Sequence, residues 1–210
     1  MMPESPQRGF PLFPLGIAAL PGESVPLHIF EDRYRKMIEY CLKSEEGEFG
    51  ILWLSDDELK RIGCACEVER VLERLDDGRM NIVVRGTRPF RLIERQDDLA
   101  YPAGTVEFLQ DDQESPDPQA LQAAHELYKE LVIQATDKEL QEPELRVLDA
   151  YAMAATVEFE VQAKQELLEL RSENARLRLL SKLLGEAIER LDLVERAQVR
   201  ALSNGKVRFG

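Results

Sequence analysis

The strongest constraint on the fold is an abrupt change of residue pattern at the acidic, proline-containing segment Gln110–Pro118 (QDDQESPDP). Before it, short runs of β-branched and aromatic residues alternate with Gly, Pro and Asp, which is typical of strands joined by turns. After it, apolar residues recur every three or four positions, which is typical of amphipathic helices. The chain is therefore predicted to be an α+β protein, with a β domain over residues 1–112 and a helical subdomain over residues 113–210.

The β half is predicted to be a curled, mostly antiparallel sheet. Asp76-Asp77-Gly78 is typical of a tight hairpin turn, because glycine readily adopts the positive φ that such a turn requires. Apolar residues of the preceding strand alternate as far as Val68, but Val71 falls out of this phase. We therefore expect a β-bulge near residues 69–71. Because bulges bend and twist a sheet, they favour its curling into a small barrel.

The expected helices fall into two groups. One helix interrupts the β half and begins near Asp32, with its apolar side chains on one side. After the boundary, a helix is expected to begin at Pro118, with Asp117 as its N-cap. A second helix is predicted from Pro143, carrying Leu145, Leu148, Ala152 and Ala155. A shorter helix is predicted over Val161–Leu170, and the last runs from a cap at Ser172 to about Leu202, where Ser203-Asn204-Gly205 forms a stop signal.

The last predicted helix carries apolar residues at alternating spacings of three and four from Leu177 to Val194, which is the pattern of a coiled-coil seam. Such a seam could join two copies of the chain. Leu179, Leu183 and Ile188 widen the apolar stripe, however, and a wide stripe is typical of a helix that packs inside a bundle. We therefore expect a C-terminal helical bundle with a long last helix, in a chain that is a monomer or weak homodimer.

The charge balance argues against a nucleic-acid partner. The chain has 27 Lys and Arg against 40 Asp and Glu, a net charge of −13, whereas phosphate backbones are bound by clustered cations. Its three cysteines, Cys41, Cys64 and Cys66, give no disulfide framework and favour a reducing compartment. Met1–Arg8 lacks the pattern of a signal peptide, and no run of 18 apolar residues occurs. We expect a cytoplasmic protein with neither a nucleic-acid nor a membrane partner.

The sequence offers little material for catalysis or for holding a cofactor. Gly205-Lys206 is the only Gly-Lys pair, and it lacks the other residues of a P-loop. His28 and His125 have no evident catalytic partner. Cys64 and Cys66 would give a zinc ion two of about four ligands, so buried core positions are the better interpretation. We expect no enzymatic activity, no cofactor and no metal site.

One loop suggests a protein-binding surface. Leu15–Gly22 is rich in Gly and Pro, so the apolar side chains of Ile17 and Leu20 are harder to hide there than in a strand. Together with Val25, at the start of the next expected strand, they form a candidate protein-binding patch. The alternative is that the loop folds under the sheet and its apolar side chains join the core.

Two segments of the β half resemble the opening of the N-terminal domain of the ATP-dependent Lon protease: Phe10-Pro-Leu-Phe-Pro-Leu15 and Pro26-Leu-His-Ile-Phe-Glu-Asp-Arg-Tyr-Arg35. Further matching segments fall in the family's order, among them Leu20-Pro-Gly22, Asp77-Gly78-Arg79 and Tyr101-Pro102. The similarity is strong over about residues 10–109 and weaker in the helices. This resemblance implies a PUA-like β pseudo-barrel followed by a helical bundle.

In the full protease of that family, this region helps to select substrates and holds no catalytic residue. The ATPase and peptidase modules are missing here, so proteolysis is not carried over, and the chain resembles a free-standing substrate-binding domain. The resemblance implies a non-catalytic module that binds unfolded or exposed apolar segments of other proteins. The alternative is a small-molecule sensor with its site in the groove between the β and helical subdomains.

Overall fold

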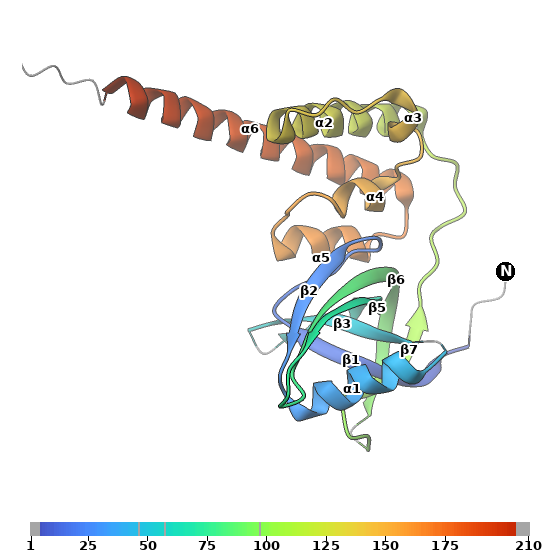
Figure 1. The fold of residues 1–210 in the computed structure, drawn as a ribbon. Coiled ribbons are helices and arrows are strands. Elements are labelled where there is room, and N and C mark those ends of the chain that lie inside the picture. Colours follow the sequence, from blue (N-terminus) through green and yellow to red (C-terminus); the bar gives the residue numbers. More distant parts are fainter. Residues whose placement is uncertain (1–4, 46, 57, 97, 205–210) are drawn as a thin grey trace, which may run out of the picture. The chain divides into compact units, whose positions relative to one another are not determined.

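The computed structural model describes residues 5–45, 47–56, 58–96 and 98–204 (Figure 1). Its described residues form two compact units, one from Met1–Gln113 and Tyr151–Ser172, the other from Glu114–Ala150 and Glu173–Gly210. The chain therefore crosses between the units three times, after Gln113, Ala150 and Ser172. The predicted division into a β domain over residues 1–112 and a helical subdomain over residues 113–210 stays a prediction.

The first unit is built on a curled sheet that is mostly antiparallel (Figure 1). The sheet has the order β1-β7-β6-β5-β3-β4, with β2 paired to β6 and a parallel pairing of β1 with β3. Strand β1 thus pairs with β7 on one side and with β3 on the other. The predicted α+β class and the curled sheet are confirmed. The strands are β1 (Gln7–Leu15), β2 (Ser24–Ile29), β3 (Glu48–Ser55), β4 (Glu58–Leu59), β5 (Ile62–Arg74), β6 (Met80–Gln96) and β7 (Ala103–Phe108).

The long hairpin of β5 and β6 forms as its turn residues predict. Gly78 has a φ of 83°, and its N–H donates to the carbonyl of Leu75 at 2.9 Å. The register of β5 on β6 shifts between Val68 and Arg70, which confirms the expected bulge. A second shift follows between Val71 and Glu73. These irregularities bend the paired strands and account for the curl.

A compact apolar core fills the inside of this sheet. Its buried members are Phe10, Leu12, Leu52, Ala65, Phe90, Leu92 and Val106. The rings of Phe10 and Phe90 meet edge to face with centroids 5.5 Å apart, a favourable aromatic geometry. Gly50 allows this packing, because a Cβ at that position would lie 2.4 Å from the Phe90 ring.

Helix α1 (Asp32–Lys43) packs its apolar side into the same unit. The residues buried on it are Tyr34, Met37, Ile38 and Cys41, whereas Leu42, which the pattern also places on this side, is exposed. Glu31 is the N-cap and makes no side-chain capping bond. Asp32, the expected cap, is the first helical residue and pairs with Arg35 one turn later.

Helix α5 (Val161–Glu169) also belongs to the first unit and packs against β5. Gln165 is buried and donates from Nε2 to the carbonyl of Ile62 at 3.1 Å. Lys164 forms an ion pair with Glu23, in the connection between β1 and β2.

The helix predicted from Pro143 is wrong in its extent: α3 (Glu142–Leu145) ends after four residues, and α4 (Ala150–Ala154) is a separate helix.

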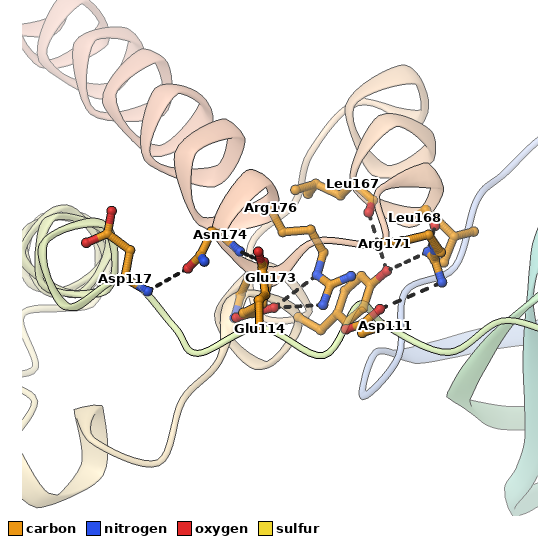
Figure 2. Close-up of polar contacts among 11 residues, drawn as sticks. Asp111, Glu114, Asp117, Leu167, Leu168, Arg171, Glu173, Asn174 and Arg176 are labelled. Carbon is orange, nitrogen blue, oxygen red and sulfur yellow. Dashed lines mark hydrogen bonds and ion pairs between the residues drawn. The ribbon is translucent and has the colours of Figure 1, made fainter. Parts of the chain in front are cut away.

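Around Arg171, polar contacts within the first unit join residues that lie next to the three places where the chain passes between units (Figure 2). Its carbonyl accepts from the N–H of Asp112 at 2.8 Å, and its guanidinium lies 3.8 Å from a carboxylate oxygen of Asp111. The same guanidinium donates to the carbonyl of Leu168 and to the hydroxyl of Tyr151. One side chain thus links segments that lie far apart in the sequence.

The second unit consists mainly of α2 (Pro118–Thr136) and α6 (Glu173–Asn204), which pack along each other. Asp117 caps α2 by accepting from the N–H of Gln119 at 2.9 Å, with Pro118 at the first position, as predicted. On α6, three residues of the predicted seam are buried, Leu177, Leu180 and Leu184, and so is Ile188 of the wider stripe, whereas Val194 at the end of the seam is exposed. The contact with α2 shows that α6 packs within the chain, and the oligomeric state stays a prediction. Gly205, part of the expected stop, lies outside the described residues.

Asn174 orders the start of α6 through contacts within the second unit (Figure 2). Its Oδ1 accepts from the N–H of Asp117 at 2.6 Å, and its own N–H donates to Glu114 at 3.0 Å. Next to it, Glu173 accepts from the N–H of Ala150 and from the buried guanidinium of Arg176.

None of the helices among the described residues has the length and apolarity needed to cross a membrane.

Candidate functional site

An apolar groove of about 440 Å³ opens on the first unit. One wall comes from the end of β1, at Phe13–Leu15, and the facing wall from the end of β2, at Leu27–Ile29. Leu54 of β3 and Leu59 of β4 also line it. Arg95 of β6, Pro102 ahead of β7, and Arg33 and Tyr34 of α1 complete the lining. The groove is thus assembled from five strands, from the connection after β2 and from the start of α1.

Two large apolar side chains in this groove face solvent. Phe30 is 60% exposed and Leu54 is 41% exposed. Phe30 stands between the last residue of β2 and the N-cap of α1, and its ring stacks on that of His28 with centroids 5.9 Å apart. An exposed aromatic side chain beside a concave apolar surface is typical of a binding site, because its burial by a partner would remove apolar area from water.

The groove is lined by a buried aromatic pair and by three charged side chains, Glu31, Arg33 and Arg95. Phe13 and Tyr34 are both buried, and their ring centroids lie 4.0 Å apart. Burial raises the pKa of the Tyr34 phenol, so it stays protonated at neutral pH. Above this ring lies the guanidinium of Arg33, 4.6 Å from the centroid, and it pairs with Glu31 at 2.8 Å. The groove therefore offers shape and apolar area more than net charge.

The described residues give this groove no evident reactive constellation. His28 contacts Asn81, with Nδ1 and Oδ1 2.7 Å apart, and Asn81 donates to Glu73 at 2.9 Å, a chain of contacts across the strands. Within the described ranges, no group of three or more His, Cys, Asp or Glu side chains could hold a metal ion.

Cys64 and Cys66 are fully buried, as expected for core residues. Burial raises the pKa of the Cys64 thiol well above its ordinary value. Because a metal binds the thiolate rather than the thiol, this environment favours a structural role.

The structure separates the three residues of the predicted protein-binding patch. Leu20 is fully buried, so it cannot belong to an exposed patch. Within the loop, the carboxylate of Glu23 accepts from the N–H of Leu20 at 3.0 Å. Ile17 and Val25 are half-buried, and a binding role for them stays a prediction. Val25 lies on the same face of β2 as Leu27, which lines the groove.

Sequence reasoning did not single out Phe30, the most exposed apolar residue of the groove. The available signal was its position, since a large aromatic residue between a strand and a helix cap has few neighbours that can cover it. The two segments that carry the family resemblance, residues 10–15 and 26–35, both contribute to the groove lining.

Comparisons with known proteins agree on one family. The family model described as "ATP-dependent protease La (LON) substrate-binding domain" matches residues 9–186. A crystal structure of a Lon N-terminal domain protein from Xanthomonas campestris is similar, with a TM-score of 0.62, 23% identity, and coverage of 82% of this chain and 96% of the other. The N-terminal domain of Mycobacterium avium complex Lon protease gives a TM-score of 0.65 at 22% identity, covering 85% and 98%.

Proposed function

Because this chain belongs to the family of ATP-dependent protease La (LON) substrate-binding domains, we propose that it is a non-catalytic module that binds unfolded or exposed apolar segments of other proteins. The binding surface in this proposal is the groove of the first unit, centred on Phe30. No residue of the groove is assigned a catalytic role, and the chain acts by recognition alone.

The observation that carries the proposal is the exposure of Phe30 beside an apolar groove of about 440 Å³. This volume lies within the range of roughly 300–1,000 Å³ that is usual for binding pockets. The contact area is nevertheless small beside a standard protein interface of about 1,600 Å². The expected affinity for an unfolded client is therefore micromolar, which allows rapid release.

Two further features belong to the proposal. The cytoplasm is the proposed compartment, since the three cysteines are free thiols and a reducing environment keeps them so. The proposed clients are neutral or basic segments, because the net charge of −13 repels acidic ones. A monomeric or weakly dimeric state and the small-molecule alternative stay predictions.

The proposal is tested by fluorescence anisotropy with a labelled, basic protein that is reduced and carbamidomethylated, so that it is permanently unfolded without added negative charge. Phe30→Asp places a charge in the apolar groove and is expected to weaken binding at least about tenfold, since a charge in an apolar contact costs more than 1.4 kcal/mol. The matched control is Val147→Asp, at an exposed apolar residue of the second unit. Ile17→Asp tests the remaining part of the predicted patch. Wild-type protein that binds no unfolded client, or equal affinities for the Phe30 and Val147 variants, would reject the proposal.

A further inference from the structure

Strand β2 has an open edge. It pairs with β6 in antiparallel register from Ser24 opposite Arg85 to Ile29 opposite Met80, and it pairs with no other strand among the described residues. A strand with one partner directs half of its backbone N–H and C=O groups away from that partner. The identity of these outward groups follows from the register.

The carbonyl of Glu23 accepts from the N–H of Gly86 at 2.9 Å, so residue 23 directs its backbone toward β6. In an antiparallel pair this orientation alternates along the strand. Residues 25, 27 and 29 therefore face β6, while Ser24, Pro26 and His28 face the open edge. Pro26 fits this assignment, because a proline without an N–H is tolerated where no ladder bond is lost.

The groove meets this open edge over the last three residues of β2. It is lined by Leu27, His28 and Ile29, which are consecutive in the strand. Consecutive side chains point to opposite faces of a sheet, so one groove that reaches all three must meet the strand at its edge. The outward backbone groups of His28 thus lie beside the apolar lining and the exposed ring of Phe30.

We propose that the groove binds an extended polypeptide as an additional strand on the open edge of β2. The client's backbone pairs with the N–H and C=O groups of His28 and Ser24 and with the C=O of Pro26, while apolar client side chains enter the groove. This inference rests on the proposed function and names its substrate class: extended segments with apolar residues at alternate positions. Main-chain pairing gives affinity for many sequences, because every residue except proline carries the same donor and acceptor.

An open edge also invites unwanted pairing, and a proline on it is a common protection. In β2 this protection is incomplete, because Pro26 removes one donor but leaves its own carbonyl and the groups of its outward neighbours. If β2 is only a protected edge, no client strand pairs with it, and the two His28 variants and the two methylated peptides described next distinguish this case from strand addition.

The first arm compares two substitutions of one residue. His28→Ala removes the imidazole and its contacts with Asn81 and Phe30 but keeps the backbone N–H. His28→Pro also removes that N–H, and it leaves the pairing with β6 intact because residue 28 faces the open edge. The probe is a fluorescent twelve-residue peptide with leucine at alternate positions. We expect His28→Pro to bind it about threefold to tenfold more weakly than His28→Ala, the usual effect of one net hydrogen bond.

The second arm leaves the protein unchanged and therefore does not depend on the folding of a variant. Two versions of the peptide carry N-methyl groups, one on the odd-numbered residues and the other on the even-numbered residues. Only one set of client N–H groups can face β2, so one version is expected to bind at least about tenfold more weakly and the other to bind nearly as the unmodified peptide does.

The outcomes separate the binding mode from the proposed function. If Phe30→Asp weakens binding but both methylated peptides bind alike and the two His28 variants do not differ, the groove binds its client and strand addition is wrong. If the wild-type protein binds neither this peptide nor the unfolded client, the proposed function fails and the strand addition fails with it.

Discussion

The ion pair between Lys164 of α5 and Glu23 should be a main attachment of that helix to the sheet. The two side chains are only 14% and 13% exposed, and Glu23 also accepts from the N–H of Leu20. Lys164→Met removes the cation and leaves the carboxylate with one remaining donor. Hydrogen bonds to charged groups contribute about 1.5–3 kcal/mol, and a buried charge without its partner costs more. We expect the free energy of unfolding of the first unit to fall by about 2–3 kcal/mol.

Urea unfolding followed by the fluorescence of Trp53 measures this effect, because the only tryptophan lies in β3 of the first unit. A double-mutant cycle with Glu23→Gln isolates the coupling between the two side chains. The control cycle uses Lys60 and Glu58, which lie 3.3 Å apart but are 31% and 73% exposed, and whose coupling should stay below about 0.5 kcal/mol. A coupling for the buried pair that is no larger than this control would refute the reasoning.

Three further predictions concern stability. Gly86→Ala should lower the free energy of unfolding of the first unit, measured in urea, by about 3 kcal/mol, because the new Cβ would lie 2.1 Å from the carbonyl oxygen of Leu20. Gly185→Ala in α6 is the control: its Cβ meets nothing within 4 Å and should stabilise by about 0.5–1 kcal/mol, so equal effects of the two substitutions would contradict this reasoning. Burial raises the pKa of the Cys41 thiol from 9.0 to about 12. The stabilisation by the buried neutral thiol is therefore complete below pH 9 and is lost as the pH rises to about 12. Melting temperatures of Cys41→Ala, measured over this pH range, should lack this loss. Leu184→Asp buries a carboxylate, costs several kcal/mol and should lower the helical signal in circular dichroism; a folded variant that only becomes monomeric in sedimentation would indicate a dimer contact instead.

Features of the fold with a local cause were predictable from the sequence. The Gly78 turn, the bulge after Val68 and the capping of α2 by Asp117 each depend on the chemistry of one or two residues. The break between α3 and α4 was not predictable, since apolar spacing continues across it. In a continuous helix, the carbonyl of Leu148 would accept from a backbone N–H of the next turn. Here the ring of His125, more than twenty residues away, contacts this carbonyl at 2.9 Å instead.

The candidate site was predictable only in its family, since its geometry depends on pairing between distant segments. The sequence shows Leu20 in a Gly- and Pro-rich loop, but it does not show that this loop lies against β6, where the N–H of Gly22 donates to the carbonyl of Gly86 at 2.8 Å and Leu20 is buried. The open edge of β2 is likewise a property of the pairing order. Val25 and Leu27 look like ordinary strand residues until the register on β6 shows which backbone groups face outward.

The central claim is that the groove around Phe30 is the surface that contacts unfolded polypeptide. Methyl-resolved NMR of the leucine-labelled full chain, titrated with the reduced and carbamidomethylated client, tests it most directly. Leu15, Leu27, Leu54 and Leu59 line the groove, while Leu193 is an exposed leucine of α6 in the second unit. The account predicts that the methyl signals of the four groove leucines shift or broaden together as client is added, while those of Leu193 stay unchanged. Shifts confined to Leu193 and its unit, with the groove signals unmoved, would contradict it.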